Sequence, residues 1–201
     1  LSGIDERERE IVADGHALTL HLVRPHGSRG RPPYFVFIHG GGWVLGDYPT
    51  HRRLVRDLVV ESEVAAVFVD YTPSPEAKYP QAVDEIYAAV KWVAENDAEL
   101  DLDRRRMALV GNSAGGNMAL AAALLAKKRH APAVRALVLL WPVTSASSDW
   151  KSYALYGGER FLTAPLMKWM FDRYTIDARA REEILLSPVN ASREDRFALP
   201  P

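Results

Sequence analysis

A serine between two glycines is the pattern in this sequence that points most directly to chemistry. Residues Gly111-Asn112-Ser113-Ala114-Gly115 have the form G-x-S-x-G, in which a serine sits on a sharp turn between a strand and a helix. Gly111 and Gly115 lack Cβ atoms, so the strand and the helix can pass close to the turn. The pattern predicts an exposed Ser113 hydroxyl that acts as a nucleophile. The alternative is a glycine-rich turn whose serine only caps the helix.

Three glycines after a histidine form the second candidate feature. The motif His39-Gly40-Gly41-Gly42 follows a continuous apolar run, and consecutive glycines are costly to order. We predict that the amides of Gly41 and Gly42, together with that of Ala114 at a helix N-terminus, form an oxyanion hole. His39 is expected to hold the loop in shape rather than to act as a base. A merely flexible loop is the alternative.

A serine nucleophile needs a general base, and the base needs a carboxylate that orients it. After a strand-turn-helix motif of this kind, the acid and the base follow the serine in the chain. His130 is the one histidine after Ser113, and it falls at the far end of the predicted helix, about 25 Å away at 1.5 Å per residue. His130 is therefore excluded, and His51 is a poor substitute. The catalytic acid and base are expected outside these residues.

The composition excludes several classes of function. A chain of 201 residues that is 48% hydrophobic and 25% charged fits one globular core. Its net charge of -1 attracts neither nucleic acid nor anionic membrane, and no apolar run approaches the roughly 20 residues of a membrane span. The basic runs 104–106 and 127–129 are interpreted as solvated. Without cysteine or ligand-spaced histidines, no metal and no cofactor are expected. The compartment stays open, with the cytoplasm favoured.

The spacing of apolar side chains indicates the elements that position these residues. The turn Asp14-Gly15 predicts a hairpin over residues 7–24, on which His16 and His21 are expected to be exposed. Other apolar segments have strand or helix character. Strands are predicted over 34–38, 64–69, 107–110 and 134–141, and helices over 49–61, 83–93, 117–128 and 162–174.

Strands that alternate with helices predict a mostly parallel α/β sheet with right-handed crossovers. Chemistry in such sheets lies at the carboxyl ends of the strands, and His39, Asp70 and Ser113 all fall at such ends. The pattern then changes, because residues 143–186 follow a strand without leading promptly to another. We interpret them as a helical insertion that roofs the site, and an ordinary crossover helix is the alternative.

Three segments of the chain resemble the bacterial hormone-sensitive-lipase family of α/β-hydrolase esterases. They are the loop over 39–42, the loop over 70–80 and the turn over 111–116. The resemblance covers essentially the whole chain and implies that Ser113 is acylated, over an oxyanion hole built from the amides already named, and that homodimers can form. Two departures concern loop details: Asn112 stands where the family has Asp, and residues 72–74 read Thr-Pro-Ser in place of Arg-Leu-Ala.

The resemblance also divides the chain. It implies a partial α/β-hydrolase core over 1–142, a helical cap insertion over 143–186 and a truncated return to the core over 187–201. Residues 198–201 should then lead into a further strand, and the chain starts at Leu1 without an initiating Met. We expect truncation at both ends and missing C-terminal strands, because the strand over 134–141 would otherwise lie at an open sheet edge.

Three functions from different classes are considered. The first is a serine carboxylesterase that forms an acyl-enzyme with small, short-acyl esters, with its acid and base beyond Pro201 and an apolar acyl pocket under the roof. The second is a non-catalytic receptor for a small ligand, since some plant hormone receptors that resemble this family have lost the histidine. The third is an interaction fragment without chemistry. We favour the esterase for the parent protein and expect these residues alone to be nearly inactive.

Overall fold

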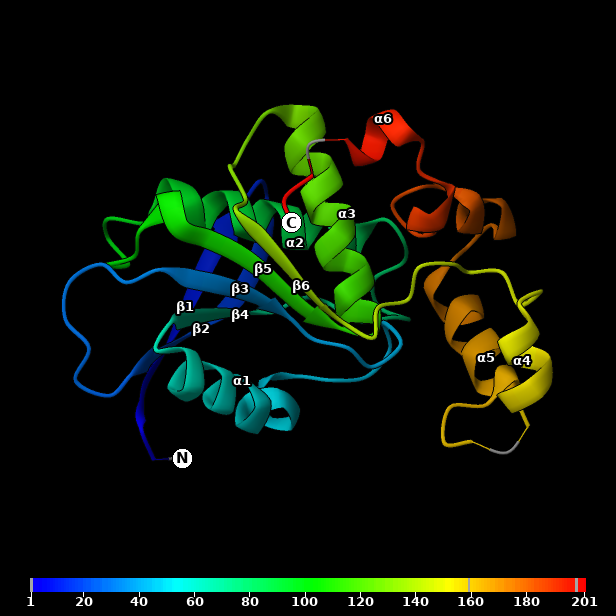
Figure 1. The fold of residues 1–201 in the computed structure, drawn as a ribbon, viewed down its shortest axis with the longest axis horizontal. Helices are drawn as coiled ribbons and strands as arrows, with labels where there is room; N and C mark the ends of the chain where they lie inside the picture. Colours follow the sequence, from blue (N-terminus) through cyan, green and yellow to red (C-terminus); the bar gives the residue numbers. More distant parts are fainter. Residues whose placement is uncertain (1, 159, 198) are drawn as a thin grey trace.

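The computed structural model describes residues 2–158, 160–197 and 199–201. These residues form a six-stranded sheet with helices on both faces (Figure 1). Two expectations involve residues outside the described ones: the chain start at Leu1, and the approach to a further strand, which begins at Ala198. Of the helices in the described ranges, none combines the length and the apolar character that crossing a membrane requires.

The sheet is mixed, with an antiparallel hairpin at one side. Its strands are β1 (Ile4–Ala13), β2 (His16–Pro25), β3 (Tyr34–Ile38), β4 (Ala65–Asp70), β5 (Met107–Asn112) and β6 (Ala136–Leu140), in the order β1-β2-β4-β3-β5-β6. Strand β2 pairs antiparallel with β1 and with β4, whereas β4, β3, β5 and β6 run parallel. The prediction of a mostly parallel sheet is confirmed. Strand β6 lies at the edge, where Leu137 donates its amide proton to the carbonyl of Pro201 at 2.8 Å.

Helices cover the two faces of the sheet unequally. The α-helices are α1 (Tyr48–Ser62), α2 (Gln81–Glu95), α3 (Ala114–Arg129), α4 (Lys151–Tyr156), α5 (Ala164–Tyr174) and α6 (Arg193–Arg196). Short 3₁₀ helices are η1 (Arg104–Arg106), η2 (Ala178–Glu182) and η3 (Pro188–Asn190). Figure 1 shows α1 on one face and α2 with α3 on the other, while α4 and α5 stand off the end of the sheet where β6 finishes. Helix α3 begins at Ala114 rather than at the predicted Asn117, because Gly115 and Gly116 belong to its first turn.

Alternation along the strands divides the core into two layers. Val36 and Val67 are fully buried toward α2 and α3, whereas Phe37 and Phe68 are fully buried toward α1, where Val55 meets them. Burying one such side chain stabilises a protein by about 1.5–3 kcal/mol. The strands before the predicted site are thus fixed from both sides.

The prediction that His16 and His21 are exposed is wrong. His21 retains 13% side-chain exposure, with its Nε2 at 2.7 Å from Asp70 Oδ2 and its ring stacked on Tyr48 at 4.0 Å. His16 is half-buried, with its Nδ1 at 3.9 Å from Glu85 Oε1 of α2. Because β2 also pairs with β4, it is an internal strand, and helices cover both of its faces.

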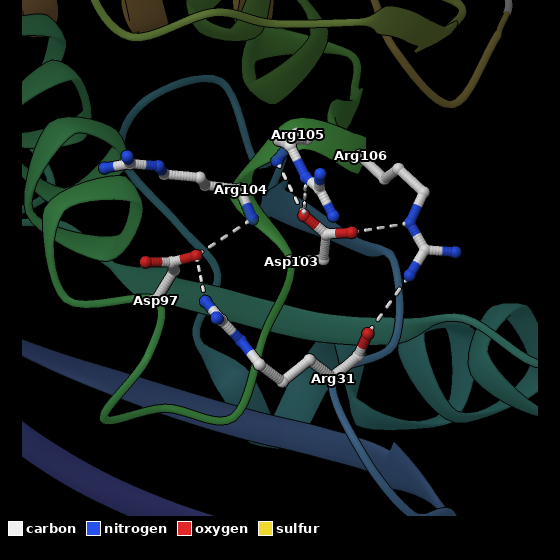
Figure 2. A pocket seen from close by; sticks show the side chains of 6 residues that line it. All are labelled: Arg31, Asp97, Asp103, Arg104, Arg105 and Arg106. Atoms are coloured by element: carbon white, nitrogen blue, oxygen red, sulfur yellow. Dashed lines mark hydrogen bonds and ion pairs between the residues drawn. The ribbon is translucent and has the colours of Figure 1, made fainter.

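A network of ion pairs fixes the loop that leads into β5 (Figure 2). Asp103 accepts hydrogen bonds from Nε of Arg105 and Nε of Arg106 at 3.2 and 2.9 Å, and the amide of Arg104 donates to Asp97 at 3.2 Å. The bonds from Arg105 lower the pKa of Asp103 to about 2. The three arginines are exposed, as predicted, and surround a hollow of about 500 Å³ at the amino end of β5. The carboxylates of Asp97 and Asp103 also line the hollow and pair with these basic residues, so the cluster fixes a turn.

Candidate active site

The turn after β5 holds Ser113 in a backbone conformation that few L-residues adopt. Its φ is 53° and its ψ is -121°, a strained combination that persists where the surroundings enforce it. The Ser113 side chain makes no capping hydrogen bond to α3, and the residue is partly exposed. The alternative of a helix-capping serine is therefore wrong, and the hydroxyl is available for chemistry.

The flanking glycines are required by close contacts. A methyl group on Gly111 would lie 2.4 Å from the carbonyl oxygen of Gly115, and one on Gly115 would lie 2.0 Å from the carbonyl oxygen of Ile38. Real Cβ atoms essentially never come so close. The steric reason given for both glycines holds, since strand β5, helix α3 and the end of β3 meet without room for side chains.

Three amides near the serine lack an acceptor in the described part of the chain. Gly41 and Gly42 donate no hydrogen bond there, and Ala114 opens α3, where the first N–H groups have no helical partner. The glycine loop runs directly past Ser113, because a methyl group on Gly40 would lie 3.1 Å from Ser113 Cβ. Amides with this freedom can bind an oxygen that becomes negative during a reaction.

Asn112, which stands where the resembled family has Asp, contacts the glycine loop. Its Oδ1 accepts from the amide of Gly40 at 2.9 Å, so a neutral amide suffices to hold the glycine loop. Its Nδ2 lies 3.5 Å from His51 Nε2. The other ring nitrogen of His51 faces Asp47 and Thr50 at the start of α1, and burial lowers the pKa of His51. Among the described residues His51 makes no hydrogen bond to Ser113, and it stays a poor candidate for the base.

His130 lies where the sequence places it, at the C-terminal end of α3. It is the C-cap residue, with φ 56°, and the whole helix separates it from Ser113. Within the described residues, no histidine is in hydrogen-bond contact with Ser113. In this arrangement none of the described histidines is placed to take a proton from Ser113.

His39 is a buried, neutral support of the glycine loop. It is 1% exposed, and its ring stacks on Tyr71 at 4.2 Å and on Phe68 at 5.5 Å. Nδ1 donates to the carbonyl oxygen of Gly40 at 2.8 Å, which assigns the proton to that nitrogen because a carbonyl oxygen can only accept. The prediction that His39 shapes the loop rather than acting as a base agrees with these contacts.

Burial of His39 should make stability depend on pH. Burial lowers the pKa of His39 from 6.5 to about 4, so the unfolded chain binds a proton that the folded protein rejects. Stability is complete above pH 6.5 and falls as the pH drops toward 4, by roughly 3 kcal/mol at 1.36 kcal/mol per pKa unit. Urea unfolding at several pH values should show a smaller loss for His39→Phe than for wild type. His26→Gln, at an exposed histidine, is the control, and equal losses in all three would contradict the assignment.

Residues 143–186 begin and pack directly beside Ser113. The Val143 amide donates to the Ser113 carbonyl at 3.2 Å. On α5, Met170 covers the glycine loop, because a methyl group on Gly42 would lie 2.0 Å from its Sδ. Trp43 is fully buried and stacks on Tyr174 of α5 at 4.8 Å. The segment therefore sits against both the turn and the glycine loop.

A hollow of about 480 Å³ lies mainly within this segment. Its lining includes Pro142, Val143, Tyr153, Tyr156 and Met167. Val143 connects the hollow to the turn, because its amide donates to the Ser113 carbonyl. Its volume falls within the range of about 300–1,000 Å³ that is usual for small-molecule sites. In the described ranges, no group of three or more His, Asp or Glu side chains is placed to hold a metal ion.

Sequence reasoning missed two contributors to this region. Asn117 is fully buried in α3, and a polar residue within an otherwise Ala- and Leu-rich helix was an available signal. Met170 falls within the helix predicted over 162–174, and nothing in the sequence indicates that it meets Gly42.

Known proteins resemble this chain over most of its length. A family model described as alpha/beta hydrolase fold matches residues 35–201. An ethyl acetate hydrolase of Pseudomonas putida is 33% identical over 184 residues, which cover 89% of this chain and 57% of that protein. Carboxylesterase NlhH of Mycobacterium tuberculosis is 33% identical over 199 residues, covering 96% of this chain and 61% of the relative.

A solved structure extends the comparison to three dimensions. The crystal structure of a thermostable esterase from Pseudomonas putida matches with a TM-score of 0.97 at 54% identity, and the match covers 100% of this chain and 63% of that one. The chain thus spans less than two thirds of the length of each of these relatives.

Proposed function

The chain belongs to the α/β-hydrolase fold family and resembles its hormone-sensitive-lipase-type esterases, and from this we propose that the whole protein hydrolyses carboxylic esters with Ser113 as nucleophile. The observation that carries the proposal is the strained, uncapped Ser113 beside amides without acceptors. Relatives named as hydrolases and esterases support it. The receptor hypothesis is not favoured, because these relatives are named as enzymes.

The proposed reaction has two steps. In the first, Ser113 Oγ attacks the ester carbonyl carbon and a base takes its proton, while the amides of Gly41, Gly42 and Ala114 bind the carbonyl oxygen as it becomes negative. The alcohol leaves with that proton. In the second step, water attacks the acyl-enzyme, and the acid is released with Ser113 restored. We place the base and its carboxylate partner outside residues 1–201.

The substrate class follows from the hollow and from the relatives. The hollow beside Val143 holds about 480 Å³ and is lined largely by aromatic and apolar side chains, which suits a small apolar ester. A relative named as ethyl acetate hydrolase supports short acyl and alcohol groups. We therefore propose esters of short carboxylic acids as substrates.

Covalent labelling tests the nucleophile directly. A fluorophosphonate should add one phosphonyl group to the full-length protein, and peptide mass spectrometry should place it on Ser113. Ser113→Ala should remove the label, whereas Ser147→Ala, at an exposed loop serine, should keep it. Label that persists in Ser113→Ala would show that another residue reacts.

A further inference from the structure

Asn117 holds both ends of the segment 143–186 with one amide group. The side chain is fully buried in the first turn of α3, four positions after Ser113. Its Nδ2 donates to the carbonyl oxygen of Val143 at 2.8 Å and to that of Leu186 at 2.9 Å. The primary amide nitrogen carries two hydrogens, so each end of the segment receives one.

Further hydrogen bonds join the two ends to each other. The Ala146 amide donates to Ser187 Oγ at 2.9 Å, and the Val189 amide donates to the Thr144 carbonyl at 3.0 Å. These hydrogen bonds pair the chain that enters the segment with the chain that leaves it. We call Asn117, Ser187 and the backbone groups that they hold the segment clamp.

The segment clamp also contacts the backbone of Ser113. The Ser113 carbonyl accepts from the amide of Asn117 at 3.1 Å and from that of Val143 at 3.2 Å. One oxygen thus connects the turn, the first turn of α3 and the first residue of the segment. A displacement of Val143 would change the lining of the hollow, whereas the backbone amide of residue 117 would still hold the Ser113 carbonyl.

We propose that Asn117 is a positioning residue. It fixes residues 143–186 at one distance from Ser113, and in this way it sets the size of the ester that fits in the hollow. This inference rests on the proposed function, because only an ester site gives the hollow a substrate. Among the described residues, Asn117 Oδ1 has no hydrogen-bond partner. Asn117→Leu therefore removes one buried acceptor that has no partner, while it leaves the carbonyls of Val143 and Leu186 without the donor that Asn117 provides. We expect this variant to fold.

Hydrogen exchange measures the clamp without reference to activity. In the full-length protein, Asn117→Leu should accelerate amide exchange across residues 143–189 by about tenfold or more and leave β3 and β5 unchanged. Asn96→Leu is the matched control, because Asn96 Nδ2 donates to the Trp92 carbonyl at 2.9 Å within α2. It should leave residues 143–189 as in wild type. Unchanged exchange there in Asn117→Leu, or equal acceleration throughout the sheet, overturns the proposal.

Kinetics measure the consequence for substrate size. Asn117→Leu should raise KM for p-nitrophenyl butyrate at least about fivefold, with kcat for p-nitrophenyl acetate within about twofold of wild type. A fall in kcat for both esters with KM unchanged would contradict a positioning role. If wild type shows no esterase activity, the proposed function fails, and the exchange experiment still decides whether Asn117 holds the segment.

Ser187→Ala gives a second, milder test. It removes the hydroxyl that accepts from Ala146 and donates to the Arg181 carbonyl, without touching α3. It should accelerate exchange in residues 143–189 by about threefold. Should Asn117→Leu fail to fold, this variant decides, and unchanged exchange in it would refute the clamp.

Discussion

Replacing Ser113 by alanine in the full-length protein should lower kcat for p-nitrophenyl acetate by roughly 10⁴-fold or more. The alanine methyl group cannot attack the ester, so the acyl-enzyme cannot form. The residual rate is the rate that the oxyanion-hole amides and the pocket provide by holding the ester near water. Initial rates measured with enough protein to see the residual activity give the ratio.

The absence of a capping hydrogen bond from Ser113 makes this loss specific. Ser113 makes no capping hydrogen bond to α3, so its hydroxyl contributes little to the fold, and the melting temperature of Ser113→Ala should stay close to that of wild type. Ser147→Ala serves as the control with full activity. If Ser113→Ala keeps a rate within tenfold of wild type, Ser113 is not the nucleophile and the proposed mechanism fails.

Local sequence patterns predicted the features that depend on a few neighbouring residues. The turn at 111–115 and the glycines at 40 and 41 require glycine because backbone meets backbone there, and such contacts leave a direct trace in the sequence. The strands over 34–38 and 64–69 were found for a similar reason, since both faces of each are buried. The roles of the site residues in catalysis stay predictions until the variants are measured.

Features that depend on distant contacts could not be predicted in this way. The exposure of His21 was misjudged because it depends on β2 pairing with β4 and on α1 covering that face, and neither is encoded near His21. The same holds for Asn117, whose two acceptors lie 26 and 69 positions away in the chain. The periodicity of apolar residues shows which side chains are buried, but it does not show which buried polar groups form hydrogen bonds with each other.

Replacing Gly41 by alanine should lower kcat by about 10²–10³-fold, the cost of losing an oxyanion donor. Gly41 has φ +123°, and a methyl group there would lie 1.9 Å from the carbonyl oxygen of Leu45. That oxygen is backbone, within a loop closed by the Leu45 amide donating to the Gly41 carbonyl at 3.0 Å. The loop must therefore shift, and the amides of Gly41 and Gly42 turn away from Ser113.

Gly30→Ala separates this effect from backbone strain alone. Gly30 has φ +72°, with nothing within 4 Å of an added methyl group, so its alanine variant carries left-handed strain of about 1–2 kcal/mol and moves nothing near Ser113. Both variants should lose stability in urea, but only Gly41→Ala should lose kcat while KM changes little. If Gly41→Ala kept full kcat despite its lower stability, the glycine loop would not bind the transition-state oxygen, and the hole would have to be built from Ala114 and other donors.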